Sequence, residues 1–316
     1  MVSEYEVLLA TCNGQDYIEE QLESIVAQSF PPVRILISDD LSNDNTLAII
    51  EKWISHSYVP VKILPPLDIR LGSCRNFERL LYSSSSDYVM LSDQDDIWDE
   101  DKAEELFRLM FIAEHKYGSE IPILVHSDLR LIDNSGKLIS KSFFHYQNLD
   151  ASRSDFLSVS LQNIVTGCST LLNQPCISFA LPFPDQVPMH DWWLAIVASL
   201  NGHIVFYPKS TLSYRQHSSN LVGASGFWSL IFRNFIVAAR NCFRFSSFVF
   251  SINLLYLCSR RFPASHSCFN HDLSSLFSSN AIVRFLMARK LSLRKHGCVR
   301  TLTFYFSLLL WRPTID

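Results

Sequence analysis

The chain has 316 residues, of which 48 % are hydrophobic and 18 % are charged, and this composition excludes an intrinsically disordered protein. The formal net charge of −4 conceals an asymmetry, because residues 227–316 hold twelve Lys/Arg and two Asp/Glu. Residues 1–226 therefore hold 27 − 12 = 15 basic and 31 − 2 = 29 acidic residues. The basic, apolar end of the chain predicts contact with something negative, either nucleic acid or anionic lipid.

Cysteines and termini indicate a cytoplasmic protein. The eight cysteines form no CxxC pair and no Cys/His metal spacing, so we expect reduced, buried thiols. The first ten residues, MVSEYEVLLA, lack the basic-then-apolar layout of a signal peptide. No run reaches the ~18–20 apolar residues that cross a bilayer.

The first 128 residues alternate between strand-like and helix-like segments. The predicted strands are 5–11, 31–40, 61–64, 87–92 and 121–128, and the predicted helices are 16–28, 42–53, 76–84 and 101–116. Such alternation favours an α/β fold with a parallel, doubly wound sheet and helices on both faces. Farther along, 154–163 and 189–202 have helical patterns and 203–208 has a strand pattern. We predict a folded α/β domain at 1–226 and a helical, basic and apolar extension at 227–316.

Acidic side chains follow the predicted strands at three places: Asp39 and Asp40, then Asp93, Asp95 and Asp96, and then Asp128. Ligands of open parallel sheets bind outside the carboxyl ends of the strands. Crowded carboxylates repel one another, and a hard divalent cation, Mg²⁺ or Mn²⁺, would relieve that repulsion while binding a substrate phosphate. The alternative is helix capping or solvation, for example by Asp99, Glu100 and Asp101. His126 and Asp128 are predicted to be structural or to face an acceptor.

Glycine-rich phosphate loops are missing. The chain has nine glycines and contains neither GxGxxG nor GxxxxGK[ST], which disfavours a dinucleotide-binding dehydrogenase and a P-loop NTPase. The glycine loop expected near the N-terminus of sugar nucleotidyltransferases is missing as well. Any bound phosphate would therefore be held by metal and side chains.

Five short segments together carry a family resemblance: LLATCNGQDYIEEQLESI, ISDDLSNDNT, GSCRNF, DYVMLSDQDDIW and HDWW. Their order and spacing resemble glycosyltransferase family 2, most closely its branch of rhamnosyltransferases in surface-polysaccharide assembly. The resemblance spans roughly residues 4–222. It implies a GT-A fold, with a mostly parallel sheet flanked by helices, an inverting mechanism and a nucleotide-sugar donor.

By this resemblance, the donor nucleoside lies at the ends of the first two strands. Thr11, Cys12 and Asn13 would line the nucleoside pocket, and Asp39 or Asp40 would bond the pyrimidine base.

The resemblance also implies groups for the diphosphate and the metal. Arg75 would lie near the base or the diphosphate, and Arg215 would neutralise the diphosphate. Asp93 and Asp95 match the DxD pair: Asp93 would face the ribose or sugar beside the metal, and Asp95 would ligate the metal. His217 would complete the metal shell, the alternative being a solvent-exposed loop histidine.

The HDWW segment supplies the predicted catalytic base, Asp191. His190 stands where the family usually has a second acid, so the role of that position is open. With Trp192 and Gly167, His190 would form the acceptor side of the site. The alternative is that Asp191 is only a helix cap and that Trp192 and Trp193 are core residues.

The tail contains FWSLIFRNFIVAARNCFRF, in which Arg233, Arg240 and Arg244 alternate with apolar residues. This pattern is typical of an amphipathic helix in a membrane interface. The alternative is helices that pack on the catalytic domain or on a second copy of the chain. Nucleic-acid binding is disfavoured, since the arginines are diluted by Phe and Leu.

The function that follows from the residues and the resemblance is a metal-dependent, inverting glycosyltransferase. It would move a sugar, with rhamnose from a dTDP donor as the first candidate and UDP-sugars as others, to a glycan or lipid-linked acceptor at the inner face of the membrane. Two alternatives remain at this point: a sugar nucleotidyltransferase, and a non-catalytic subunit that binds sugar nucleotides.

Overall fold

The computed structural model describes residues 4–187, 189–216, 261 and 280–310. The chain divides into two compact units, 1–144 with 165–224 and 145–164 with 225–316, and each is described by itself. The amphipathic stretch of the tail and His217 lie outside the described residues. Segment 145–164 belongs to the C-terminal unit, which a single boundary at residue 226 does not anticipate.

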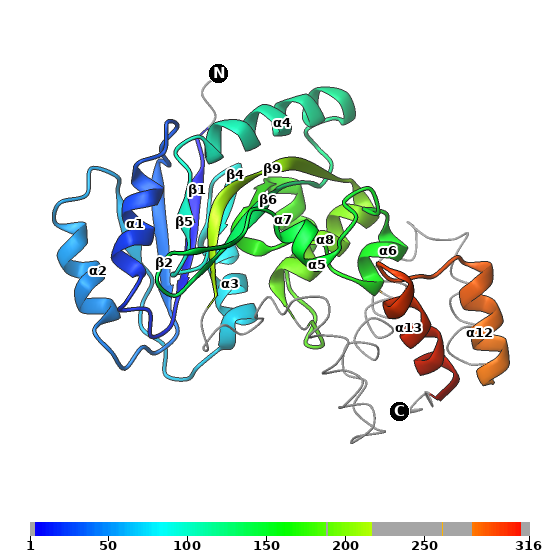
Figure 1. Ribbon diagram of the computed structural model, residues 1–316. Helices are drawn as coiled ribbons and strands as arrows, with labels where there is room; N and C mark the ends of the chain where they lie inside the picture. The colour runs from blue at the N-terminus through cyan, green and yellow to red at the C-terminus, as the bar shows by residue number, and fades with distance from the viewer. Residues whose placement is uncertain (1–3, 188, 217–260, 262–279, 311–316) are drawn as a thin grey trace. The chain divides into compact units, whose positions relative to one another are not determined.

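A mixed sheet forms the centre of the first unit (Figure 1). Its order is β3-β2-β1-β4-β8-β6-β9-β5, and β7 pairs with β6. The strands are β1 (Glu6–Thr11), β2 (Arg34–Asp39), β3 (Val61–Ile63), β4 (Tyr88–Ser92), β5 (Ile97–Trp98), β6 (Ile123–Asp133), β7 (Leu138–Ser140), β8 (Thr170–Asn173) and β9 (His203–Gln216). β1, β2, β3 and β4 are mutually parallel, and β9 is parallel to β6.

The predicted α/β fold with helices flanking the sheet is confirmed, and antiparallel pairs join the parallel strands in the second half of the chain. β8, with its four residues all buried, runs antiparallel between β4 and β6. A buried four-residue strand has no alternating pattern by which the sequence would reveal it. β6 also continues past the predicted end at Asp128, whose carboxylate accepts hydrogen bonds from the backbone N–H of Leu129, Phe143 and Phe144.

Helices cover this sheet. They are α1 (Ile18–Val26), α2 (Thr46–Ile54), α3 (Gly72–Ser83), α4 (Lys102–Tyr117), α7 (Gln174–Ala180) and α8 (His190–Asn201), with the short α5 (Phe143–Gln147) and the 3₁₀ turn η1 (Gly167–Ser169). α1 shows why they form, because its buried residues Ile18, Leu22 and Ile25 recur at helical spacing. α3 packs on β1 and β2, and α8 packs on α3, β6 and β9.

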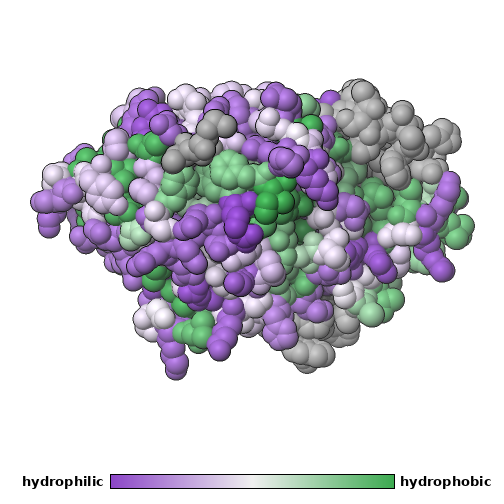
Figure 2. Space-filling view, turned by 90° about the horizontal axis from the view of Figure 1, so that it is seen from above, coloured by the Kyte–Doolittle hydropathy of each residue, from purple (hydrophilic) through white to green (hydrophobic). Residues whose placement is uncertain are grey.

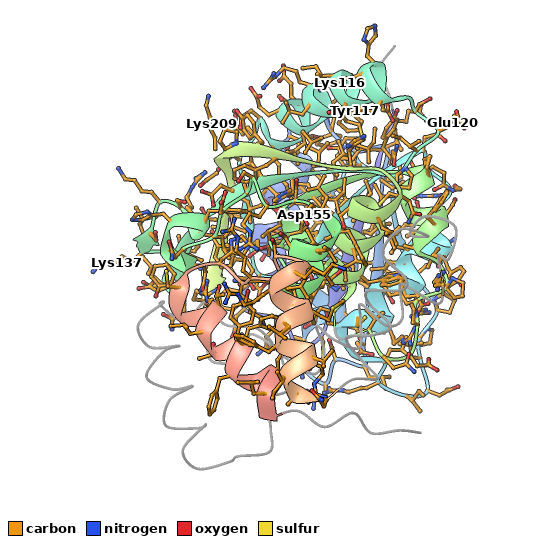
Figure 3. All side chains as sticks on the ribbon, turned by 90° about the vertical axis from the view of Figure 1, so that its right-hand side faces the viewer. Lys116, Tyr117, Glu120, Lys137, Asp155 and Lys209 are labelled. Atoms are coloured by element: carbon orange, nitrogen blue, oxygen red, sulfur yellow. The ribbon has the colours of Figure 1, made fainter. Side chains whose placement is uncertain are left out.

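The carboxyl end of α4 is fixed against the start of β9. Tyr117 stacks on His203 with ring centroids 3.6 Å apart, and the Lys116 ammonium lies 4.7 Å from the centre of the Tyr117 ring (Figure 3). The helix ends at Gly118, whose φ of 98° is a conformation that glycine adopts without a steric penalty.

The surface seen in Figure 2 mixes hydrophilic and apolar residues. Among the described residues, no helix is both long and apolar enough to span a membrane. The described cysteines are all free thiols, but the prediction that they are buried holds only for Cys168 and Cys176, since Cys298 is exposed.

The C-terminal unit contains α6 (Phe156–Leu161), α12 (Ala281–Lys290) and α13 (Cys298–Leu310), so the prediction of a helical extension is confirmed for its described residues. α12 and α13 pack together through Phe285 and Tyr305, whose ring centroids are 5.4 Å apart. The Arg284 Nε donates to the carbonyl of Leu308 at 3.3 Å, which satisfies a buried guanidinium between the helices.

Candidate functional site

The ends of β1 and β2 are joined by side-chain hydrogen bonds. Thr11 Oγ1 donates to Asp39 Oδ1 at 2.9 Å, and Asp39 also accepts from the backbone N–H of Ser42 at 2.8 Å. Asn13 has a φ of 53° and receives the N–H of Asn43 on its Oδ1 at 2.8 Å. The residues predicted to line the nucleoside pocket therefore form one hydrogen-bonded loop cluster at the carboxyl edge of the sheet.

Asp40 is buried and points at the beginning of α3. Its two carboxylate oxygens accept from the N–H groups of Leu71 at 2.6 Å and Gly72 at 2.9 Å. Asp39 and Asp40 thus have different tasks: Asp39 ties two strand ends together, whereas Asp40 anchors a helix.

Gln94 connects the first loop to the aspartate cluster. Its Oε1 accepts from the N–H of Cys12 at 2.7 Å, and its Nε2 donates to the carbonyl of Cys12 at 3.0 Å. A Cβ on Gly14 would lie 2.4 Å from the Gln94 side chain, so the loop closes tightly around it. Gln94 was not among the predicted site residues, and its only signal in the sequence is its place between Asp93 and Asp95.

The structure groups Asp93 with Asp96 and Cys168, whose potential ligand atoms all lie within 4.8 Å of one another. Asp96 is 1 % exposed, and its Oδ2 has no hydrogen-bond partner. Withdrawal from water, followed by the charge of Asp95, raises the pKa of Asp96 to about 7. The pKa of Asp93 is raised well above its usual range by the same withdrawal, then by the charges of Asp96, Asp95 and Asp191.

A divalent cation fits this cluster by its electrostatics. The two carboxylates of this group, Asp93 and Asp96, both have raised pKa values, and the buried Asp96 Oδ2 lacks a hydrogen-bond partner. Hard cations prefer such oxygen ligands. This group contains the predicted ligand Asp93 together with Asp96, which was not among the predicted ligands, but it does not include Asp95, whose role as a ligand stays a prediction.

A buried lysine balances part of this negative charge. The Lys102 ammonium donates to the carbonyl of Cys168 at 2.6 Å and lies 3.1 Å from the centre of the Trp98 ring. Burial lowers the pKa of Lys102 to about 7, against the raising effect of Asp96.

The capping alternative fails at this helix, because Asp101 is the N-terminal flanking residue of α4 and makes no side-chain cap hydrogen bond.

Arg215, at the end of β9, is fastened to the same cluster. Its N–H donates to Asp96 Oδ1 at 3.3 Å, its Nε donates to the carbonyl of Asp95 at 3.0 Å, and its guanidinium pairs with Glu20 at 2.6 Å. The guanidinium also lies 4.7 Å from the Tyr17 ring. Arg215 therefore holds the aspartate loop in shape, and its predicted contact with a diphosphate stays a prediction.

Asp191 lies in the first turn of α8, where the helix dipole favours a negative charge. Its Oδ2 accepts from the N–H of Gly167 at 3.3 Å, and its Oδ1 accepts from the N–H of Trp192 at 2.6 Å. Its charge is near enough to raise the pKa of Asp93. The predicted base and the DxD aspartates thus belong to one electrostatic neighbourhood.

His190 is a packing residue. It is 3 % exposed, its ring stacks on Phe77 at 3.9 Å, and neither ring nitrogen has a hydrogen-bond partner. Burial lowers its pKa to about 3. A Cβ on Gly167 would lie 2.5 Å from His190 Nε2, so glycine is required there by close approach. Trp192 is half-buried beside them, and the acceptor role of these three residues stays a prediction.

Arg75 is engaged by Glu78 and by the segment that precedes α8. It pairs with Glu78, donates to the carbonyls of Phe183 at 3.0 Å and Pro184 at 3.1 Å, and contacts Asp185 at 3.0 Å. In this arrangement it organises the chain that leads into α8, while its predicted approach to the base or diphosphate stays a prediction.

A model of glycosyl transferase family 2 matches residues 6–126. The dTDP-rhamnosyl transferase RfbG of Shigella flexneri is 33 % identical over 224 residues, which cover 69 % of this chain and 74 % of that protein. The chain belongs to glycosyltransferase family 2.

Other relatives agree with this family. Poly(ribitol-phosphate) β-N-acetylglucosaminyltransferase TarS of Staphylococcus aureus is 30 % identical over 134 residues, 42 % of this chain and 21 % of that protein. The crystal structure of TarS residues 1–349 with UDP-GlcNAc aligns over 97 % of this chain and 90 % of that chain, with a TM-score of 0.54 at 16 % identity. A mannosyltransferase of Pyrobaculum calidifontis, solved with GDP-Man and Mn²⁺, aligns over 97 % and 85 % with a TM-score of 0.53 at 15 % identity. This family-2 glycosyltransferase therefore has the GT-A fold.

Proposed function

We propose that this family-2 glycosyltransferase transfers rhamnose from dTDP-rhamnose, with inversion, to a glycan carried on a lipid during surface-polysaccharide synthesis. The observation that carries the proposal is that η1 lies at both parts of the site: the Gly167 N–H donates to Asp191, and the next residue, Cys168, is grouped with Asp93 and Asp96. An inverting transfer needs a base and a diphosphate-binding group around one reacting carbon. The choice of dTDP-rhamnose as the donor rests on the similarity to RfbG, a dTDP-rhamnosyl transferase.

The residues divide the work between binding and proton transfer. The loop of Thr11, Cys12 and Asn13, braced by Gln94, receives the nucleoside. Asp191 takes the proton of the acceptor hydroxyl, a task that typically contributes 10²- to 10⁴-fold to the rate. Its position is fixed by the two N–H donors of Gly167 and Trp192.

The aspartate cluster receives the diphosphate side of the donor. Asp93, Asp95 and Asp96 would hold Mg²⁺ or Mn²⁺, with His217 as a further predicted ligand. When bound, such an ion stabilises charge on a departing diphosphate. The chain's own contribution is to exclude water from Asp96 and to fix the aspartate loop through Arg215.

A donor screen tests the proposal. Each nucleotide sugar is added with and without Mn²⁺, and the melting temperature is recorded. A ligand at 100 times its dissociation constant stabilises the folded protein by about 2.7 kcal/mol, so dTDP-rhamnose should raise the melting temperature most, and only with the metal. The variant Asp95→Ala should lose the response. If another nucleotide sugar gives the largest shift, the rhamnose donor is wrong.

Membrane association through the basic tail belongs to the same proposal. The described part of 227–316 is helical and basic, with Arg284, Arg289, Lys290, Arg294, Lys295 and Arg300 and no acidic residue between 280 and 310. Basic residues are attracted to the anionic lipids of the cytoplasmic leaflet. An enzyme bound there through this region would lie next to a lipid-linked acceptor at the membrane surface.

A further inference from the structure

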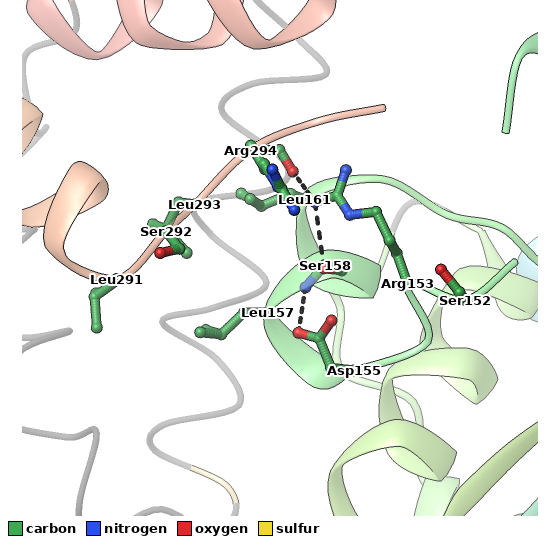
Figure 4. Close-up of a pocket in the computed structure, with 10 residues that line it drawn as sticks. All are labelled: Ser152, Arg153, Asp155, Leu157, Ser158, Leu161, Leu291, Ser292, Leu293 and Arg294. Carbon is green, nitrogen blue, oxygen red and sulfur yellow. Dashed lines mark hydrogen bonds between the residues drawn. The ribbon is translucent and has the colours of Figure 1, made fainter. Parts of the chain in front are cut away.

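The C-terminal unit contains a cavity of about 230 Å³ between α6 and the link from α12 to α13 (Figure 4). Two arginines, Arg153 and Arg294, line it from the two segments. Leu157, Leu161 and Leu293 are among the apolar lining residues. The cavity is smaller than the ~300–1,000 Å³ of pockets for drug-sized ligands, so it suits a small group rather than a whole nucleotide sugar.

The chain builds this cavity by a sharp turn after α12. Ser292 adopts a φ of 53°, and the N–H of Leu293 then returns to the carbonyl of Ala288 at 2.8 Å. This turn buries Leu293 and leaves the Arg294 side chain exposed. Arg153 donates to Ser158 Oγ at 3.3 Å and to the carbonyl of Arg294. The second hydrogen bond joins the two chain segments that line the cavity.

Positive charge around this cavity is poorly compensated. In 145–164 and 280–310 there are seven Lys/Arg and two Asp, a balance of 7 − 2 = +5. Both carboxylates are already engaged: Asp155 accepts from the N–H of Ser158 at 3.0 Å, and Asp150 accepts from the N–H of Ser152 at 3.0 Å. Among the described residues of this unit, no salt bridge to Arg153 or Arg294 is found.

Burial lowers the pKa values of several basic groups near this cavity, and neighbouring positive charge adds to the effect for three of them. The pKa of Arg153 is lowered by burial and then by the charge of Arg294. Burial, then Arg300, lowers the pKa of Lys295 to about 8. The pKa of His296 falls to about 4 through burial and the charges of Arg153 and Arg300, and its buried Nε2 has no hydrogen-bond partner. An anion in the cavity would oppose the part of these shifts that comes from neighbouring positive charge.

We propose that this cavity binds the phosphate or diphosphate end of a lipid, with Arg153 and Arg294 on the anion and the leucines on the first carbons of the chain. Arginine forks match phosphate oxygens, and leucines match hydrocarbon. α12 and α13 expose further apolar side chains, Leu286, Leu302 and Phe306 at 56 %, 67 % and 59 %. The statement that this lipid carries the acceptor glycan rests on the proposed function. The statement that the cavity binds a lipid phosphate does not depend on it.

Calorimetric titration of the full chain tests the site. The probes are farnesyl diphosphate, kept below its aggregation limit, and inorganic pyrophosphate, both in EDTA so that no metal assists binding elsewhere. Farnesyl diphosphate should bind at least ~10-fold more tightly than pyrophosphate, since each buried CH₂ contributes ~0.8 kcal/mol. Arg294→Ala should weaken the binding of farnesyl diphosphate by ~10-fold or more, the value of one charge-assisted hydrogen bond.

Arg289→Ala is the matched control, because Arg289 is exposed at the end of α12 and does not line the cavity. It removes the same charge and should change the affinity less than twofold. Leu157→Trp, which fills the cavity without a change of charge, should abolish binding in a protein that still melts cooperatively. Equal losses for Arg289→Ala and Arg294→Ala, or no binding by the wild type, would overturn the site. Equal affinity for the two probes would overturn the lipid preference.

These measurements use neither donor nor transfer. A failed titration in a chain that still transfers sugar therefore contradicts only this site, and a chain that binds farnesyl diphosphate without transferring sugar contradicts only the proposed function.

Discussion

Gly167→Ala is the substitution whose cost can be worked out most directly from the structure. The added methyl would lie 2.5 Å from His190 Nε2, and 3.4 and 3.5 Å from Cδ2 and Cε1 of the same ring. The ring must therefore move by at least 3.0 − 2.5 = 0.5 Å, and by 3.4 − 2.5 = 0.9 Å to reach ordinary van der Waals contact. Phe77 stacks against the ring at 3.9 Å, so the movement displaces packed side chains.

Overpacking of a well-packed core costs about 1–3 kcal/mol. For a unit of this size, each kcal/mol lowers the melting temperature by about 2–4 °C, so Gly167→Ala should melt roughly 2–12 °C below the wild type. His190 precedes Asp191, and the Gly167 N–H holds the Asp191 carboxylate. A displacement of about 1 Å at such a site can lower kcat by ~10²-fold.

Thermal melting and transfer kinetics, read on one set of variants, check this reasoning. In a His190→Ala background, where the ring is gone, Gly167→Ala should cost little further stability, because the two effects share one contact. An unchanged melting temperature and kcat for Gly167→Ala would refute the argument, as would a full loss in the His190→Ala background.

Further predictions concern the loops around the aspartates. Gln94→Ala removes both hydrogen bonds to the Cys12 backbone. Denaturant unfolding should show a loss of about 1–3 kcal/mol in the free energy of unfolding. Steady-state kinetics should show a higher KM for the donor. In EDTA, the folded pKa of Asp96, about 7, exceeds its unfolded value of about 3.9. The folded state then keeps a proton that the unfolded state releases, so this group's contribution to stability falls as pH rises from 4 to 7. Asp96→Asn should therefore gain in melting temperature relative to wild type across that range, and Mn²⁺ should reduce the gain; a pH-independent difference would contradict the burial of this carboxyl.

The sequence predicted the first half of the fold because its signals there are local. β1 and β2 are apolar runs closed by polar residues, and α1 and α4 repeat apolar residues at helical spacing. β8 was missed because its placement depends on pairing with β4 and β6, strands far away in the chain. Local signals also revealed Asp39, because it lies at the end of a predicted strand. Gln94 had no such signal, because its partner Cys12 is 82 positions away in the chain.

The candidate site shows a similar division. The family segments were enough to predict Asp93, Asp95 and Asp191, since each lies within a recognisable short sequence. The burial of Asp96 among Cys168, Lys102 and Arg215 has no local signal, because those residues come together only when η1, α4 and β9 meet. His190 is buried and stacks on Phe77, a packing contact that no local signal in HDWW reveals, while its predicted acceptor role stays a prediction.

The most direct test of the account is transfer by Asp191→Asn, measured beside donor binding in the same protein. The amide keeps the shape of the side chain but removes the proton acceptor. The account predicts an unchanged dissociation constant for dTDP-rhamnose in the presence of Mn²⁺, together with a 10²- to 10⁴-fold loss of kcat. Transfer at the wild-type rate by Asp191→Asn would contradict the assignment of the base and, with it, the arrangement of the site.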